Sequence, residues 1–300
     1  MKIFHSIEEY RASELSRGEA GSAVTLGKFD GIHIGHQKLI RDIVSRAGAS
    51  GLTSIVFAIE MKDGAILSHE ERAEYLESMG VDVLLECPFS ESLMKMRAPE
   101  FARTVLFGTL HAVYAAVGPD FAFGHHREGN AEGLAELGAA AGCQTRILEK
   151  ERFDGADVSS TRVREALRKA DMELAAKLLG RPYPITGIVR HGRHIGTGIG
   201  FPTVNILPEE GKILPPDGVY ASVTMLPGKI VRKGLTNVGI RPTVGGRERR
   251  AETTLFDFDS DLYGERISHA LTRFIRPEKK FASLEALKEQ IGKDAEAARG

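Results

Sequence analysis

The chain has 300 residues and a formal net charge of −1, with 42% hydrophobic and 27% charged residues. This length is about twice that of a usual domain, so we expect two compact units, each with its own core. The balance of acidic and basic residues removes the attraction that drives non-specific nucleic-acid binding. No apolar run is long enough to cross a bilayer. We therefore expect neither a nucleic-acid nor a membrane partner.

Two features favour a cytoplasmic protein. The N-terminal sequence MKIFHSIEEY lacks the apolar stretch of a secretory signal. Cys87 and Cys143 lie far apart without a CxxC pair, which argues against a disulfide framework or a thiolate metal site. The sequence leaves the oligomeric state open, a weak homo-oligomer included.

The first half of the chain alternates short β-rich runs with helical patterns. This alternation predicts an α/β unit with an open, doubly wound, Rossmann-like parallel sheet. The expected strands are residues 23–26, 53–57, 81–85, 111–117 and 144–148. The expected helices follow Gly35 and then cover residues 70–79, 99–106 and 131–141.

Two more helical patterns, 160–168 and 171–179, precede Gly180 and Pro182, which cannot continue a helix. We place a domain boundary there, between residues 1–180 and 181–300. Beyond it, short β runs separated by turns predict a small antiparallel β-barrel. These runs are residues 183–189, 201–206, 218–226, 229–238, 252–258 and 266–274. A terminal helix is expected after Ser283, its N-cap, with Leu284, Leu287 and Ile291 along one face.

The strongest local signal is GKFDGIHIGH, residues 27–36, between the first strand of the sheet and the following helix. Glycines at this point let a ligand approach the backbone, and the helix N-terminus offers free N–H groups to phosphates. His33 and His36, three residues apart, would lie on one side and stabilise charge on a departing phosphate group. The other residues that we assign to nucleotide binding here are Gly27, Phe29, Asp30 and Gly35. A metal site is an alternative that lacks a third nearby ligand, and a plain glycine turn is another.

A second segment, VSSTRVR at residues 158–164, opens another helix with hydroxyls followed by arginines. Ser159, Ser160, Thr161 and Arg164 would grip the terminal phosphates of a nucleotide. The alternative is an ordinary Ser/Thr cap followed by a solvated basic face.

A third segment, GPDFAFG at residues 118–124, is followed by Arg127 and Gly129. Alone it reads equally well as a strand end with an aromatic turn. Together, the three segments resemble the bacterial bifunctional riboflavin kinase and FAD synthetase, whose N-terminal half is a nucleotidylyltransferase with an HxGH signature. The resemblance implies flavin contacts for residues of the third segment. These are Asp120, Phe123, Gly124 and Arg127.

The same resemblance implies direct adenylyl transfer, in which the phosphate of FMN attacks the α-phosphorus of ATP and pyrophosphate leaves. A site of glycines, histidines and hydroxyls suits such a reaction, because its catalysis is mostly alignment and electrostatic stabilisation. The chain departs from the family pattern at FAIEMK, residues 57–62, where many members have Pro-His-Pro, and at Lys28, where asparagine is common.

The second half contains a glycine-rich loop that leads into a strand, with Gly192, Gly196 and Gly200 before FPTVN at residues 201–205. It is neither a Walker A sequence nor a Rossmann fingerprint, but its glycines would let phosphates approach the backbone. Thr203 and Asn205 alternate on one strand face, so both side chains can reach one Mg²⁺ ion. A β-bulge with a polar face is the alternative.

Two further segments, NVGIRPT at residues 237–243 and ETTLFDF at residues 252–258, complete a resemblance to riboflavin kinase over the second half. That resemblance implies Mg²⁺ and ATP binding by Thr203 and Asn205, and it makes Glu252 the general base toward the ribityl hydroxyl. The alternative for Glu252 is a cross-strand pair with a basic residue such as Arg249. Thr197 stands where the family usually has arginine.

The sequence therefore predicts an enzyme that uses ATP and Mg²⁺ to convert riboflavin into FMN and FMN into FAD. Riboflavin, FMN and ATP are the expected small-molecule partners. Two alternatives stay open: a protein that retains one of the two activities, and a non-catalytic flavin or nucleotide sensor.

Overall fold

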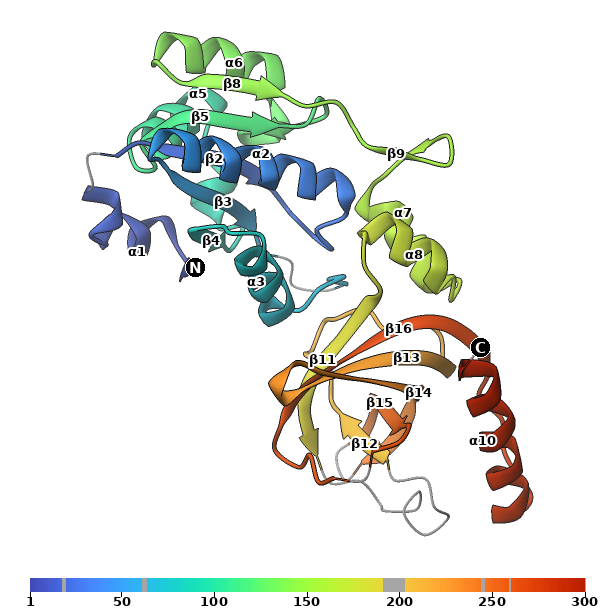
Figure 1. The fold of residues 1–300 in the computed structure, drawn as a ribbon. Coiled ribbons are helices and arrows are strands. Elements are labelled where there is room, and N and C mark those ends of the chain that lie inside the picture. The colour runs from blue at the N-terminus through green and yellow to red at the C-terminus, as the bar shows by residue number, and fades with distance from the viewer. Residues whose placement is uncertain (18–19, 61–63, 191–202, 244–245, 259, 300) are drawn as a thin grey trace. The chain divides into compact units, whose positions relative to one another are not determined.

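The structure, a computed structural model, describes residues 1–17, 20–60, 64–190, 203–243, 246–258 and 260–299. The chain divides into two compact units (Figure 1). The first contains Met1–Lys62 and His69–Val158, and the second contains Asp63–Ser68 and Ser159–Gly300. A short segment that lies in sequence within the first unit thus belongs to the second.

A six-stranded parallel sheet forms the centre of the first unit, in the order β1-β4-β3-β2-β5-β8. Its strands are β1 (Lys2–Phe4), β2 (Ser22–Gly27), β3 (Thr53–Ile59), β4 (Val83–Cys87), β5 (Ala112–Val117) and β8 (Gln144–Ile147). The predicted parallel α/β unit is confirmed. The edge strand β1 was not predicted, because three residues carry too little pattern and its partner β4 is distant in sequence.

Helices cover both faces of this sheet. They are α1 (Ile7–Ala12), α2 (Ile34–Ser50), α3 (His69–Ser78), α4 (Glu91–Lys95), α5 (Ala98–Phe101) and α6 (Ala131–Ala140), with a π-helical turn at Ala102–Phe107. α2 packs on β2, β3 and β5 through its buried Ile40, Ile43 and Ala47. Because both of their faces are buried, the inner strands β2, β3, β4 and β5 are nearly continuous apolar runs, as parallel sheets require.

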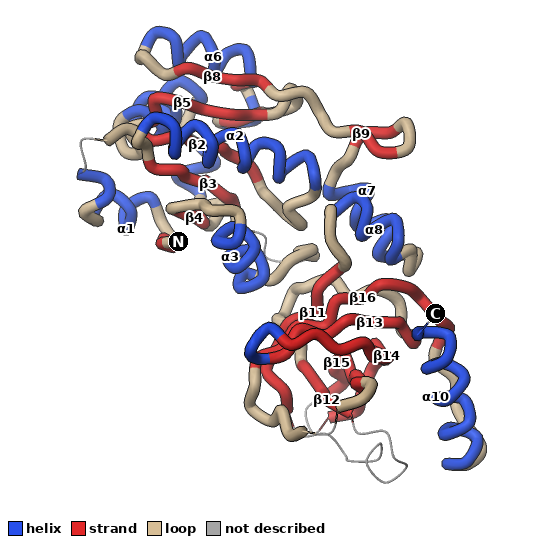
Figure 2. Tube along the Cα trace, in the orientation of Figure 1, coloured by secondary structure: helices blue, strands red, loops and turns tan. Residues whose placement is uncertain are grey.

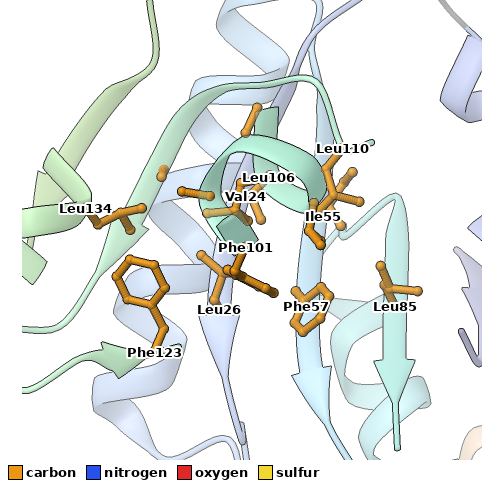
Figure 3. Packing of buried hydrophobic residues seen from close by; sticks show 14 of the residues in the cluster. Val24, Leu26, Ile55, Phe57, Leu85, Phe101, Leu106, Leu110, Phe123 and Leu134 are labelled. Atoms are coloured by element: carbon orange, nitrogen blue, oxygen red, sulfur yellow. The ribbon is translucent and has the colours of Figure 1, made fainter. Parts of the chain in front are cut away.

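The opposite face carries the main apolar core of this unit (Figure 3). Alternate strand residues such as Val24, Leu26, Ile55 and Phe57 point into it. The helices, loops and short strand β6 (Ala122–Phe123) on that side contribute Phe101, Leu106, Leu110, Phe123 and Leu134. This packing fixes the sheet, and with it the loops that leave its carboxyl edge.

The second unit begins with α7 (Ser160–Arg168) and α8 (Met172–Leu179). α8 ends at Gly180, whose φ of 68° is the left-handed conformation that favours glycine at a helix end. α8 packs on β11 (Tyr183–Arg190) and β16 (Arg266–Pro277). Helices and strands alternate through the first unit, whereas strands dominate the second (Figure 2).

Beyond α8 the chain forms a closed antiparallel barrel in the order β11-β12-β15-β14-β13-β16, which confirms the predicted barrel. Its other strands are β12 (Thr203–Ile206), β13 (Gly218–Leu226), β14 (Ile230–Thr243) and β15 (Gly246–Leu255). The interior holds apolar side chains together with hydrogen-bonded hydroxyls. Thr236, for example, contacts the hydroxyls of Ser222 and Thr253 at 2.8 and 2.7 Å.

Two details of the predicted barrel were wrong. The strand expected at residues 252–258 ends at Leu255, because the chain turns there and Asp257 has a φ of 54°. The terminal helix α10 (Leu284–Arg299) does not pack through Leu284, which is 55% exposed. The expected Ile291 does pack, together with Ala295 and Ala298, against a buried cluster of Val219, Leu235 and Phe256.

The N-cap of α10 was predicted correctly, since the Ser283 hydroxyl accepts a hydrogen bond from the Ala286 N–H at 3.2 Å. A buried ion pair also holds this helix to the barrel: the Asp294 carboxylate accepts hydrogen bonds from Arg276 at 2.7 to 3.0 Å. Within the described residues, no helix combines the length and apolar character needed to span a membrane.

Candidate active sites

The histidine loop, residues 27–36, leaves the carboxyl end of β2 and leads into α2. β2 lies between β3 and β5, so the chain winds away from it on both sides. This is the switch point of the sheet, where open α/β folds bind their ligands. The loop after β5, which contains residues 118–124, leaves the same edge next to it. Two of the predicted segments are therefore neighbours.

The backbone of the histidine loop adopts unusual conformations. Phe29, Gly31 and Ile32 have φ values of 45°, 82° and 42°. Such values are costly for a β-branched residue like Ile32, and they persist only where the surroundings fix them. Phe29 and Ile32 are fully buried and anchor the loop. A Cβ on Gly35 would lie 3.3 Å from the His33 ring, so glycine leaves room for that ring over the helix N-terminus.

The two histidines lie together at the start of α2. Their rings stack with centroids 3.7 Å apart and an interplanar angle of 17°. His33 is the N-cap of the helix, and its Nδ1 accepts a hydrogen bond from the His36 backbone N–H at 3.3 Å. The Phe29 ring lies 5.1 Å from His36, and Asp30 is 1% exposed. The structure thus brings together the predicted residues of this loop.

Burial keeps both imidazoles neutral at pH 7. It lowers the pKa of His33 to about 4, against the opposing effect of the Asp120 charge. The pKa of His36 lies well below 6.5 because of burial and the nearby His33 and Arg72. Since Nδ1 of His33 accepts a hydrogen bond, its proton is on Nε2. His33 can therefore offer an N–H to a phosphate oxygen without first gaining a charge.

Sequence reasoning missed a buried charged cluster at this edge of the sheet. Arg72 of α3 is 1% exposed and donates to the carboxylate of Glu86, which is 4% exposed and lies on β4. Nδ1 of His69 lies 2.8 Å from the other oxygen of Glu86. Arg on an amphipathic helix normally faces solvent, and Glu is seldom buried in a strand, so only the tertiary fold could identify this pair.

The loop at residues 118–124 is divided between core and surface. Asp120 is exposed and pairs with Lys150 at 3.1 Å. Phe123 is 8% exposed and belongs to the main core, packed on Phe101. Gly124 has a φ of 77° and its backbone lies against Ala98. Arg127 is exposed. Flavin contacts for these residues stay a prediction.

The segment at residues 158–164 lies almost entirely in the second unit, whose longer part begins at Ser159. The Ser159 hydroxyl accepts a hydrogen bond from the Arg162 N–H at 3.3 Å and caps α7. Ser160 and Thr161 form the first turn of that helix. The Nε of Arg164 donates to the carbonyl of Gly64 at 3.2 Å. The Ser/Thr cap is therefore real, and the nucleotide-binding role of these residues stays a prediction.

The predicted kinase residues meet on the outside of the barrel. Thr203 donates a hydrogen bond to Oε1 of Glu252 at 2.8 Å. In the β12–β15 register Asn205 lies opposite Glu252, and Asn205 is 8% exposed. Gly192, Gly196, Thr197 and Gly200 lie outside the described residues. A hydroxyl, an amide and a carboxylate on two neighbouring strands fit the oxygen ligands that Mg²⁺ prefers.

Arg249, the basic residue named as an alternative partner of Glu252, has other partners in the structure. Arg249 lies opposite Ile240 in the β14–β15 register and pairs with Asp217, at 3.0 Å from its Nε. It also donates to the carbonyls of Leu214 and Pro215. Arg249 therefore holds the chain before β13, and it does not serve as the partner of Glu252.

No metal-ligand set is formed by three or more His, Cys, Asp or Glu side chains anywhere in the described part of the chain. The stacked pair of His33 and His36 accordingly has no third such ligand among those residues. The geometry around the pair instead combines a helix N-terminus, buried neutral imidazoles and a strained loop, which together suit an anionic ligand.

Comparisons with known proteins cover nearly the whole chain. A family model described as FAD synthetase matches residues 16–162, and one described as riboflavin kinase matches residues 179–300. A protein of Haemophilus influenzae named bifunctional riboflavin kinase/FMN adenylyltransferase is 36% identical over 93% of this chain and 94% of its own length. A Bacillus subtilis protein of the same name is 33% identical, over 99% of this chain and 97% of its own.

A solved structure agrees with the fold. A crystal structure described as a macrolide-efflux protein from Streptococcus pneumoniae superposes with a TM-score of 0.84 and 31% identity. The match covers 94% of this chain and 95% of that one.

Proposed function

The chain belongs to the family of bifunctional riboflavin kinase/FMN adenylyltransferases, and we propose how its residues divide the two reactions. Residues 181–300 phosphorylate riboflavin to FMN with ATP, and residues 1–180 adenylylate FMN to FAD with release of pyrophosphate. The observation that carries this division is the presence of two separate polar constellations, one at the switch point of the sheet and one on the barrel.

In the kinase half, Glu252 takes the proton of the ribityl 5′-hydroxyl as that oxygen attacks the γ-phosphorus of ATP. The hydrogen bond from Thr203 orients the carboxylate on the barrel face, and Asn205 lies opposite it in the β12–β15 register. Proton transfer by a positioned base accelerates such reactions by roughly 10²- to 10⁴-fold. Thr203 and Asn205 would hold Mg²⁺, which when bound neutralises phosphate charge.

In the adenylyltransferase half, the histidine loop binds the phosphates of ATP. His33 donates a hydrogen bond through Nε2, and the N–H groups of Ile34 and Gly35 lie in the first turn of the helix that His33 caps. As negative charge develops on pyrophosphate, neutral imidazoles in a buried site stabilise it by hydrogen bonding rather than by a permanent charge. No residue of this site has to form a covalent bond with substrate.

Both family models and the curated relatives name flavin chemistry over the same residues. The substrates ATP, FMN and riboflavin favour a cytoplasmic location.

Two single substitutions test the division of labour. Glu252→Gln keeps the size of the side chain and removes the base, so it should abolish FMN formation while FAD formation from supplied FMN continues. His36→Ala should do the reverse. The assay is chromatography of flavins after incubation with ATP and Mg²⁺, with circular dichroism to check folding. Loss of both activities in either folded variant would refute the division, and a wild-type protein that forms neither product would favour the sensor.

A further inference from the structure

Three side chains form a row across the outer face of the barrel. Glu252 on β15 lies between its register partners, Asn205 on β12 and Asn237 on β14. Directly opposite residues in an antiparallel sheet have Cβ atoms about 4.5–5.5 Å apart and share a face. The base therefore has one amide on each side, and only the β12 side also carries the Thr203 hydroxyl.

The amide of Asn237 has a fixed orientation. Its Nδ2 donates to Oε1 of Glu278 at 3.0 Å, just beyond the end of β16. A carboxylate only accepts hydrogen bonds, so it selects the NH₂ side of the amide. The carbonyl oxygen, Oδ1, is buried and has no hydrogen-bond partner in the described residues. Buried acceptors are normally paired, so this atom is an acceptor without a donor beside the proposed base.

Gly239 makes room for this arrangement. It follows Asn237 by two residues on the same strand face, and a Cβ placed on it would lie 2.3 Å from Oε1 of Glu278. The Glu278 carboxylate therefore lies over the bare backbone at Gly239, beside the amide that it orients. Any larger residue at this position would displace the carboxylate.

We propose that Asn237 binds the ribityl chain of riboflavin, accepting a hydrogen bond from a ribityl hydroxyl through Oδ1, and that Glu278 is its positioning residue. This inference rests on the proposed kinase function. Ribityl hydroxyls are donors, as Oδ1 requires, whereas phosphate oxygens are acceptors and would be repelled by the Glu278 carboxylate. The hydroxyl chain therefore approaches Glu252 from the β14 side, and the triphosphate from the β12 side.

The test compares riboflavin with lumiflavin, which has the same ring system and a methyl group in place of the ribityl chain. Asn237→Ala should weaken riboflavin binding, measured by quenching of flavin fluorescence, about two- to tenfold, as expected for one neutral hydrogen bond. Lumiflavin binding and the KM for ATP should stay unchanged. Lys233→Ala is the matched control, because Lys233 is exposed on the same face of β14.

Glu278→Ala and Gly239→Ala test the positioning role. Each should weaken riboflavin binding by a smaller factor, about two- to threefold, and neither should weaken it further when combined with Asn237→Ala. Glu278→Gln, which keeps an acceptor oxygen, should restore most of the binding. Circular dichroism and unchanged lumiflavin binding report that the barrel of each variant is folded.

Three results would overturn the inference: equal weakening of riboflavin and lumiflavin by Asn237→Ala, a change in the KM for ATP alone, or unchanged riboflavin binding. A wild-type protein that makes no FMN would remove the kinase function and this inference together. An active wild type with an unaffected Asn237→Ala variant would remove the inference alone.

Discussion

The buried pair of Arg72 and Glu86 offers the sharpest test of how the first unit is held together. The two side chains are 1% and 4% exposed, and they are joined by a hydrogen bond between α3 and β4. Arg72→Met keeps much of the apolar volume and removes the charge, which leaves the Glu86 carboxylate in a buried site. Removing one partner of a buried pair destabilises a protein by about 3–5 kcal/mol.

Replacing both partners should cost less than replacing one. In Arg72→Met/Glu86→Met no buried charge is left behind, and exchange of a buried ion pair for apolar side chains is often nearly neutral. His69, which also contacts Glu86, is 42% exposed and can be hydrated instead. The two substitutions should therefore be strongly non-additive, with the double variant more stable than Arg72→Met alone. Arg72→Lys, which keeps the charge, should fall between wild type and Arg72→Met.

The measurement is urea unfolding followed by circular dichroism, because the chain has no tryptophan. Kinase activity across the same urea series reports on the second unit, and its midpoint should not move. A cost below about 1 kcal/mol for Arg72→Met, or a double variant equal to the sum of the single ones, would refute the assignment of a desolvated pair.

Three further predictions concern pH, the terminal helix and one glycine. Burial lowers the pKa of His269 to about 3 and that of His33 to about 4. The contribution of these neutral rings to the free energy of unfolding should therefore be fully present above pH 6.5. It should fall between pH 6.5 and these pKa values, by up to about 1.4 kcal/mol per pH unit for each ring. Urea unfolding of His269→Gln should show a shallower slope of stability against pH, and an unchanged slope would contradict this. Asp294→Ala removes the buried acceptor of Arg276 and Gln290, so limited proteolysis should cut residues 279–299 faster while FMN adenylylation continues. Cleavage at the wild-type rate would contradict the role of Asp294 in holding α10 to the barrel. Gly124 and Gly142 share a φ of 77°, but only at Gly124 would an added Cβ lie 2.6 Å from neighbouring backbone. Thermal unfolding should therefore show a larger loss of stability for Gly124→Ala than for Gly142→Ala, beyond the roughly 1 kcal/mol of the left-handed conformation. Equal losses of stability would contradict the close approach.

The features that the sequence predicts are those carried by local patterns. Apolar runs identify β2 and its neighbours, and the glycine and histidine pattern at residues 27–36 identifies the loop at the end of β2. The family resemblance implied that the loop after β5 belongs to the same site, and its position next to the loop after β2 follows from the strand order β2-β5. Alternation along β12 likewise predicted that Thr203 and Asn205 share a face.

The features that escaped prediction depend on contacts between distant segments. β1 is recognisable only through its pairing with β4. Glu252 and Asn237 become neighbours through the register of β14 and β15, and Glu278 reaches Asn237 from beyond the last strand. Charged residues such as Arg72 look like surface positions on any helical pattern. Register and burial are set by the whole fold, so composition and periodicity do not carry them.

The most direct test of the account follows the phosphorus atoms of ATP. Riboflavin is incubated with the wild-type chain, Mg²⁺ and ATP labelled at either the γ- or the α-phosphorus, and the flavins are separated. The γ label should enter FMN and persist in FAD, whereas the α label should enter FAD and never FMN. Appearance of the α label in FMN, or FMN without the γ label, would contradict two separate transfers to two different flavin oxygens.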